Sequence, residues 1–189
     1  IGPIELLRTD VRFRRLWFSQ VVSELGDWFQ LVALLTLLPT SGGKSHVVAG
    51  YLVLRLVPVV VWAPLAGIVA DRVNRGRVLI VCDVLRALVV LLYPLVIRGD
   101  GSTNVMLLYV LSFTQESLSA FFEPARGAVI PQIVPTRGLL SANALSGATW
   151  SAMLALGAAL GGLATRHLGR NAAYAIDAAS FLASAAFVW

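Results

Sequence analysis

The chain has 189 residues, of which 58% are hydrophobic and 13% are charged, and its mean hydropathy is +0.80. Charged residues are too few to cover a soluble domain of this length, and the apolar residues form long runs, so the composition excludes a water-soluble globular protein and predicts an integral membrane protein. The net charge of +5 does not indicate nucleic-acid binding, because the basic residues lie between the apolar runs and do not form one patch.

Six apolar runs are long enough to cross a bilayer, for which a helix needs roughly 20 residues. They are also too long, and too uniformly apolar, for the strands of a membrane barrel. We therefore predict an all-α integral membrane protein in which residues 1–189 form a single bundle of six transmembrane helices. The predicted spans are 16–38, 47–70, 78–97, 104–124, 139–164 and 171–189.

The basic residues of the connecting segments are distributed unevenly. Successive connections lie on alternate sides of the membrane, which places nine arginines on one side and four basic residues on the other. The positive-inside rule then predicts that the N-terminus and the connection at 71–77 lie in the cytoplasm. The nine are Arg8, Arg12, Arg14, Arg15, Arg72, Arg75, Arg77, Arg126 and Arg137, and the four are Lys44, Arg98, Arg166 and Arg170.

Three ionisable residues lie at similar depth in the first two spans. Glu24 and Asp27 are three residues apart, so they share one face of the first helix, roughly 12–17 Å from its cytoplasmic start. Arg55 lies about 12 Å deep from the opposite side, so we expect the three to meet near the midplane. A charge there is costly unless it faces the bundle interior and has a partner. Two interpretations remain open: a proton or substrate-cation site, and an ion pair that joins the two helices.

Four more ionisable residues lie within the later spans. Asp83 and Arg86, three residues apart near the cytoplasmic end of the third span, are interpreted as a structural ion pair. Glu116 is the most isolated acid of the set and is a candidate protonatable or cation-binding group. Asp177, in the outer third of the last span, is expected to form a hydrogen bond between helices.

The fifth span contains the sequence GAALGG, in which Gly157 and Gly161 have GxxxG spacing and Gly162 follows. Small residues at positions i and i+4 allow two helix backbones to approach closely. These three glycines therefore predict close helix packing.

No enzymatic, metal or cofactor site is predicted. Cys82 is the single cysteine, which excludes an internal disulfide and a cysteine-based metal site. The two histidines, His46 and His167, fall in different predicted connections without a carboxylate cluster beside them. No serine has a nearby His–carboxylate pair, and no glycine-rich phosphate loop is present.

The stretch AGIVADRVNRGRV (66–78) carries a recognisable signature. Gly67, Asp71, Arg72, Arg75 and Arg77 resemble the G-x-x-x-D-R-x-G-R-[RK]-[RK] motif of the major facilitator superfamily. That motif belongs in the cytoplasmic connection between helices 2 and 3, which is where the charge distribution places it. In the family, the glycine allows close helix approach and the acid helps to latch the contact with the second half of the transporter. We therefore expect a gating role for these five residues.

The order and spacing of several further segments, among them LLSANAL and AIDAASFLAS, are similar to the macrolide-efflux and siderophore-exporter branch of that superfamily. This resemblance implies one half of a twelve-helix fold in which substrate binds between two six-helix halves. The chain is accordingly expected to be the N-terminal half.

The resemblance implies an efflux-type secondary transporter of the inner (cytoplasmic) membrane that exports a small amphipathic molecule by alternating access, with proton coupling as an option. Its implied partners are the lipid bilayer, the substrate, and a C-terminal six-helix half or a second copy of the chain. Two alternatives stay open. One is a non-transporting anchor or lipid-handling module that is fused to, or assembles with, a separate enzyme. The other is a half-size transporter that works as a homodimer.

Overall fold

A computed structural model of the protein describes residues 2–37, 45–97 and 102–189. Lys44 and Arg98, which contribute to the predicted topology, lie outside these ranges. The helices, in chain order, are α1 (Pro3–Thr9), α2 (Val11–Leu37), α3 (Ser45–Arg72), α4 (Arg75–Val90), the 3-10 helix η2 (Tyr93–Val96), α5 (Val105–Ile133), the 3-10 helix η3 (Thr136–Gly138), α6 (Leu139–Leu168) and α7 (Arg170–Val188).

Polar side chains at the helix starts explain several of these boundaries. The Asp10 carboxylate accepts a hydrogen bond from the backbone N–H of Phe13 at the start of α2. Asn74 accepts one from the Arg77 N–H, and so it caps α4 at the position where the superfamily motif has glycine. Gly169, with φ of +83°, adopts a backbone conformation that favours glycine and separates α6 from α7.

Proline does not end the helices where the sequence suggested. α5 continues through Pro124 and Pro131 to Ile133, past the predicted end at residue 124, because a membrane bundle can satisfy the backbone groups that proline frees. The segment between the predicted spans 104–124 and 139–164 is therefore largely helical. Conversely, α4 ends at Val90 and Pro94 lies in η2, so the third predicted span consists of an α-helix followed by a 3-10 turn.

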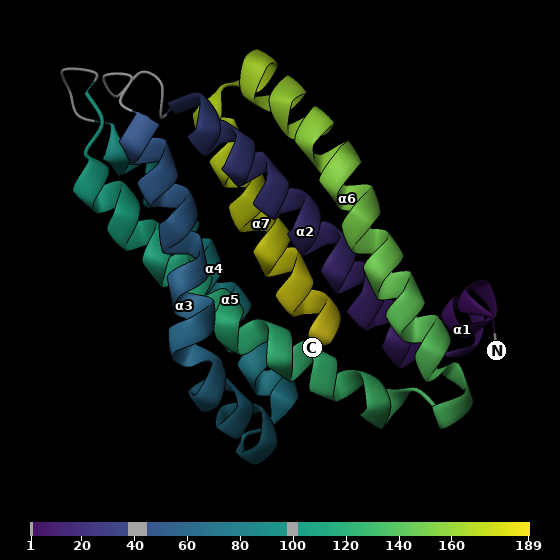
Figure 1. Ribbon diagram of the computed structural model, residues 1–189. Coiled ribbons are helices and arrows are strands. Elements are labelled where there is room, and N and C mark those ends of the chain that lie inside the picture. The colour runs from purple at the N-terminus through teal and green to yellow at the C-terminus, as the bar shows by residue number, and fades with distance from the viewer. Residues whose placement is uncertain (1, 38–44, 98–101) are drawn as a thin grey trace.

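The long helices divide into two groups, with α3, α4 and α5 in one and α2, α6 and α7 in the other (Figure 1). α2 packs against both α6 and α7, and α3 packs against α5. α4 lies against α5 on one side and α7 on the other, so the α4–α7 contact joins the two groups. Direct contact between α2 and α5 is slight, and this leaves room between the groups.

Five helices in the described ranges are long and apolar enough to cross a membrane: Val47–Arg72, Arg75–Val96, Val105–Ile133, Thr136–Leu168 and Arg170–Val188. α2 is also long enough, about 40 Å for its 27 residues, but its polar residues make it less apolar than the others. With α2, these helices make up the all-α six-helix membrane bundle that the sequence predicts.

A polar layer crosses the middle of the bundle between two buried apolar clusters. Along α4, Leu79 belongs to one cluster and Val90 to the other, while the buried Asp83 and Arg86 lie between them. The same succession is found on α2 and α5, and on α7 the buried Ser184 follows Phe181 of the first cluster and precedes Val188, which packs against the second. This layer positions the candidate site.

Candidate functional site

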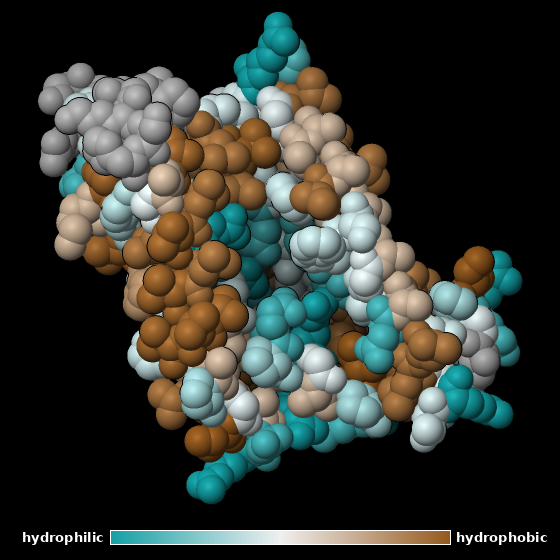
Figure 2. Space-filling view, viewed as in Figure 1, coloured by the Kyte–Doolittle hydropathy of each residue, from teal (hydrophilic) through white to brown (hydrophobic). Residues whose placement is uncertain are grey.

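A cavity of about 550 Å³ lies at the level of the polar layer, between the two groups of helices. In the space-filling view it is a hydrophilic hollow flanked by apolar residues (Figure 2). Residues from α2, α3, α4, η2, α5 and α6 line it. They are Glu24, Asp27, Trp28, Gln30, Leu31, Tyr51, Arg55, Arg86, Tyr93, Ser112, Gln115, Glu116, Ser119, Glu123, Arg126 and Trp150.

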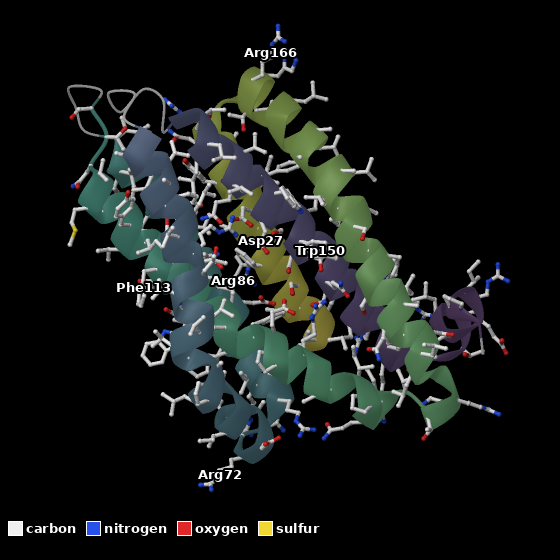
Figure 3. All side chains as sticks on the ribbon, in the orientation of Figure 1. Asp27, Arg72, Arg86, Phe113, Trp150 and Arg166 are labelled. Atoms are coloured by element: carbon white, nitrogen blue, oxygen red, sulfur yellow. The ribbon has the colours of Figure 1, made fainter. Side chains whose placement is uncertain are left out.

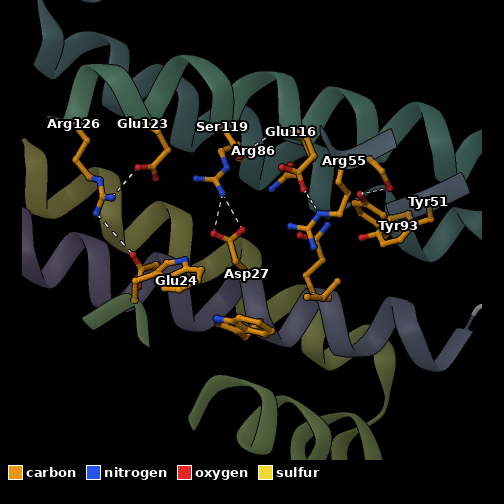
Figure 4. Close-up of a pocket in the computed structure, with 16 residues that line it drawn as sticks. Glu24, Asp27, Tyr51, Arg55, Arg86, Tyr93, Glu116, Ser119, Glu123 and Arg126 are labelled. Carbon is orange, nitrogen blue, oxygen red and sulfur yellow. Dashed lines mark hydrogen bonds and ion pairs between the residues drawn. The ribbon is translucent and has the colours of Figure 1, made fainter. Parts of the chain in front are cut away.

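Arg86 of α4 forms an ion pair in which both oxygens of one carboxylate take part. Its Nη2 donates to both carboxylate oxygens of Asp27 on α2, each at 2.9 Å (Figures 3 and 4). The Arg86 side chain is 5% exposed, whereas that of Asp27 is 35% exposed and faces the hollow. Its guanidinium also lies over the Phe181 ring, 4.0 Å from the ring centroid, a cation–π arrangement that holds it in place. Arg86 therefore joins α4 to the cavity wall on α2.

The second ion pair joins α3 to α5. Arg55 Nε donates to Glu116 Oε1 at 2.5 Å, with the two side chains 33% and 17% exposed. At the next residue of α5, Ser117 Oγ accepts a hydrogen bond of 2.9 Å from Trp62 Nε1 of α3. These two contacts hold the α3–α5 wall together.

The third group of charges joins α2 to α5 at the other end of the hollow. Arg126 lies between two acids, 2.7 Å from Glu123 Oε2 and 3.8 Å from Glu24 Oε1. Glu24 Oε1 also accepts a 2.7 Å hydrogen bond from Gln20 Nε2, one turn earlier on α2. Arg126 thus bridges the two helices whose direct contact is slight.

The structure brings the predicted cavity residues together but changes their partners. Glu24, Asp27, Arg55 and Glu116 all line the one cavity. The sequence predicted that Arg55 meets Glu24 and Asp27, but Arg55 forms no ion pair with either of them. Arg55 pairs with Glu116 because α3 packs on α5 and not on α2. Glu116 is therefore not an isolated acid.

Asp83 and Asp177 lie behind the cavity wall. Arg86 Nη1 is 3.7 Å from Asp83 Oδ1, so the predicted Asp83–Arg86 contact exists, but Arg86 makes its closer pair with Asp27. Asp177 accepts a 3.4 Å hydrogen bond from Ser180 on its own helix, where the sequence predicted a bond between helices. Its carboxylate lies against Gly26 of α2, a position with no room for a side chain.

Sequence reasoning missed Glu123 and Arg126 as cavity residues. The predicted span ends at residue 124, which places Arg126 in a cytoplasmic connection. The available signal was their i, i+3 spacing, together with the two-turn spacing from Glu116 to Glu123 on one face. Tyr93, which also lines the cavity, gave no such signal.

The signature residues lie at the α3–α4 connection, away from the cavity. The Asp71 side chain is 78% exposed and 3.7 Å from Arg75. Arg75 donates to the backbone carbonyls of Ala70, at 2.7 Å, and Ala128 of α5, at 3.1 Å. Arg72 and Arg77 are exposed, and a Cβ at Gly67 would have open space around it. Arg72 and Arg166, which the charge distribution assigns to opposite sides, lie at opposite ends of the bundle (Figure 3).

Two of the three helix-packing glycines lie at a close contact with α2. A Cβ at Gly157 would be 2.7 Å from the Trp28 side chain, and a Cβ at Gly161 would be 3.0 Å from the Trp28 carbonyl oxygen. A Cβ at Gly162 would meet nothing within 4 Å. The α6–α2 contact therefore depends on Gly157 and Gly161, and it fixes Trp28 at the cavity wall.

A helical membrane bundle with a charged central cavity is typical of membrane transporters, and comparison with known protein families assigns the chain to such a class. The family model described as transmembrane secretion effector matches residues 1–189. The chain belongs to this family, within the major facilitator superfamily of transporters, and its relatives there are transporters rather than enzymes. No solved structure matches at a significant level.

Several bacterial relatives resemble the chain. It is 28% identical over 97% of its length to the uncharacterized MFS-type transporter YfiS of Bacillus subtilis, 30% over 92% to a candidate bacilysin exporter, BacE, of Bacillus amyloliquefaciens, and 26% over 88% to macrolide efflux protein A of Streptococcus pyogenes. The chain spans 43%, 42% and 41% of their respective lengths, or somewhat under half of each.

Proposed function

We propose that the chain forms the N-terminal half of an efflux-type secondary transporter that exports a small amphipathic compound by alternating access. The observation that carries this proposal is the central cavity, whose wall combines ion-paired side chains with the aromatic residues Trp28, Trp150 and Tyr51. Such a wall suits a ligand with both polar and flat apolar parts. Relatives named as exporters of bacilysin and macrolides support the direction of transport.

We propose that Glu24, Asp27 and Glu116 take part in proton coupling. Each carboxylate faces the cavity and each lies beside an arginine of another helix, namely Arg126, Arg86 and Arg55. Protonation of a carboxylate removes its attraction for the arginine. Proton binding can therefore loosen a contact between helices, which links it to a change of conformation.

We propose that the signature residues act in gating at the end of the bundle that carries the α3–α4 connection. Arg75 fixes the α3–α4 connection to α5, while Asp71 remains exposed and able to reach a partner. We propose that this partner is a second six-helix half. The N-terminus and the α3–α4 connection would then lie in the cytoplasm, with the bundle in the inner membrane.

An export assay with the complete gene tests the proposal. An efflux-deficient bacterium that expresses it should accumulate less of at least one amphipathic compound from a panel. Combined E24Q, D27N and E116Q substitutions should abolish the dependence of export on the proton gradient. The matched control is E5Q, at an exposed acid of α1. A gene product that exports no compound of the panel and carries a soluble enzymatic domain would favour the alternative of a membrane module.

A further inference from the structure

Two carboxylates contact one guanidinium inside the bundle, and a third is buried on a neighbouring helix. Arg86 Nη2 binds both oxygens of Asp27 at 2.9 Å, and its Nη1 lies 3.7 Å from Asp83 Oδ1. Asp177 of α7 is one turn before Phe181, and the same guanidinium lies over the Phe181 ring. We call these four residues the Arg86 cluster. One guanidinium can neutralise only one ionised carboxylate, so the cluster has two acids more than its cation can compensate.

The two acids in excess are the most deeply buried. Asp83 and Asp177 are both 0% exposed, whereas Asp27 reaches the cavity. Asp83 Oδ1, Asp177 Oδ2 and Arg86 Nε are buried and have no hydrogen-bond partner among the residues that the structure describes. An uncompensated charge is costly at this depth in a membrane, and a carboxyl group can avoid that cost by binding a proton.

Charged groups on the neighbouring helices do not supply the missing compensation. Arg55 of α3 acts on Asp27 but is paired with Glu116. From α5, Glu123 adds a further negative charge near the cluster and is paired with Arg126. On α4 itself, the titratable neighbour is Cys82, which is buried.

Asp83 has a hydrogen-bonded route away from the cavity. Ser184 of α7 donates to Asp83 Oδ2, and its hydroxyl is in turn 2.7 Å from the Ser19 hydroxyl of α2. All three side chains are buried between α2, α4 and α7. Hydroxyl groups both donate and accept hydrogen bonds, so the Ser184 and Ser19 hydroxyls can carry a proton to or from Asp83.

We propose that Asp83 and Asp177 form a second proton-binding site, and that Arg86 exchanges Asp27 for Asp83 when Asp27 is protonated from the cavity. This rests on the proposed coupling role of Asp27. In the exchange the Asp27 carboxylate gains one proton and becomes neutral. The neutral Asp83 releases one proton, which passes along the hydroxyls of Ser184 and Ser19 and leaves to bulk water, and Asp83 becomes the ionised partner of Arg86. The guanidinium keeps its charge throughout, so the total charge of the cluster is unchanged.

Infrared spectroscopy of the complete purified transporter at neutral pH tests the site, because protonated carboxyl groups have a separate C=O stretching band. D83N and D177N should each remove one component of that band. D27N should remove the same component as D83N, although the wild-type Asp27 is ionised, because Arg86 then pairs with Asp83 and ionises it. The matched control is E116Q, which neutralises a cavity acid that pairs with a different arginine and should leave the Asp83 component intact.

The proposal is overturned if the band is unchanged in D83N and D177N, or if D27N retains the Asp83 component. S184A provides a second test that keeps Asp83 itself: loss of the Ser184 hydrogen bond should shift the Asp83 component in frequency without removing it, and an unshifted band would contradict the assignment. The spectra need no substrate, so a protein that exported nothing would still give a result for this site.

Discussion

The Gly157→Ala substitution gives a direct test of the α6–α2 contact. The new methyl carbon would lie 2.7 Å from Cβ, Cγ and Cδ1 of Trp28, closer than carbon atoms pack, and Cβ is not a flexible end that can move aside. Overpacking of this kind costs typically about 1–3 kcal/mol. The matched control is Gly162→Ala on the same helix, where the methyl group meets nothing within 4 Å. Both variants share the gain in helix propensity of about 0.5–1 kcal/mol, so their difference measures the packing cost.

Thermal unfolding in detergent, followed by tryptophan fluorescence, provides the assay. For a chain of 150–250 residues, 1 kcal/mol shifts the Tm by roughly 2–4 °C. Gly157→Ala should therefore unfold at least about 2 °C below Gly162→Ala. Equal Tm values for the two variants, or a higher value for Gly157→Ala, would refute the close contact between α6 and α2.

Three further predictions concern the α3–α4 connection, the cavity wall and the core. Arg75→Ala should lower the free energy of unfolding by about 1.5–3 kcal/mol, because its charge-assisted hydrogen bonds to Ala70 and Ala128 are lost. Arg77→Ala, at an exposed neighbour, should change the free energy of unfolding by less than about 0.5 kcal/mol. Denaturant unfolding measures both variants, and equal effects would contradict the anchoring role of Arg75. Arg55→Gln and Glu116→Gln should show a coupling energy of about 0.5–3 kcal/mol in a double-mutant cycle, and additive effects would mean that the pair contributes nothing. Cys82, which is 6% exposed, should react slowly with a maleimide in the folded protein and fully after denaturation; rapid labelling in the folded state would show that the core is open.

The helical membrane fold could be predicted because a long apolar run in lipid must satisfy its own backbone hydrogen bonds, and a helix does so. The helix ends were harder to predict. Pro124 would end a helix in most soluble proteins, but α5 continues through it and carries Arg126 into the cavity wall. Asp71 and Arg72, assigned to a connection by their charge, lie in the last turn of α3. Charge and proline mark the end of an apolar run more reliably than the end of a membrane helix.

The members of the site could be predicted better than their pairings. Ionisable residues within apolar spans indicated Glu24, Asp27, Arg55 and Glu116, since such charges must face the bundle interior. Their partners depend on which helices are neighbours. The spacing of apolar residues does not show which helices are neighbours, because the lipid-facing side of a membrane helix is as apolar as its buried side. Val60 of α3, for example, is 75% exposed.

The cavity acids Glu24, Asp27 and Glu116 are proposed to couple export to proton movement. The most direct test of this coupling is transport by the complete protein in proteoliposomes, with a compound identified in the export assay and an imposed pH gradient. The wild type should accelerate export with the gradient, whereas the E24Q/D27N/E116Q variant should exchange the compound across the membrane at a rate independent of the gradient. Export by the triple variant that still follows the pH gradient would contradict the account.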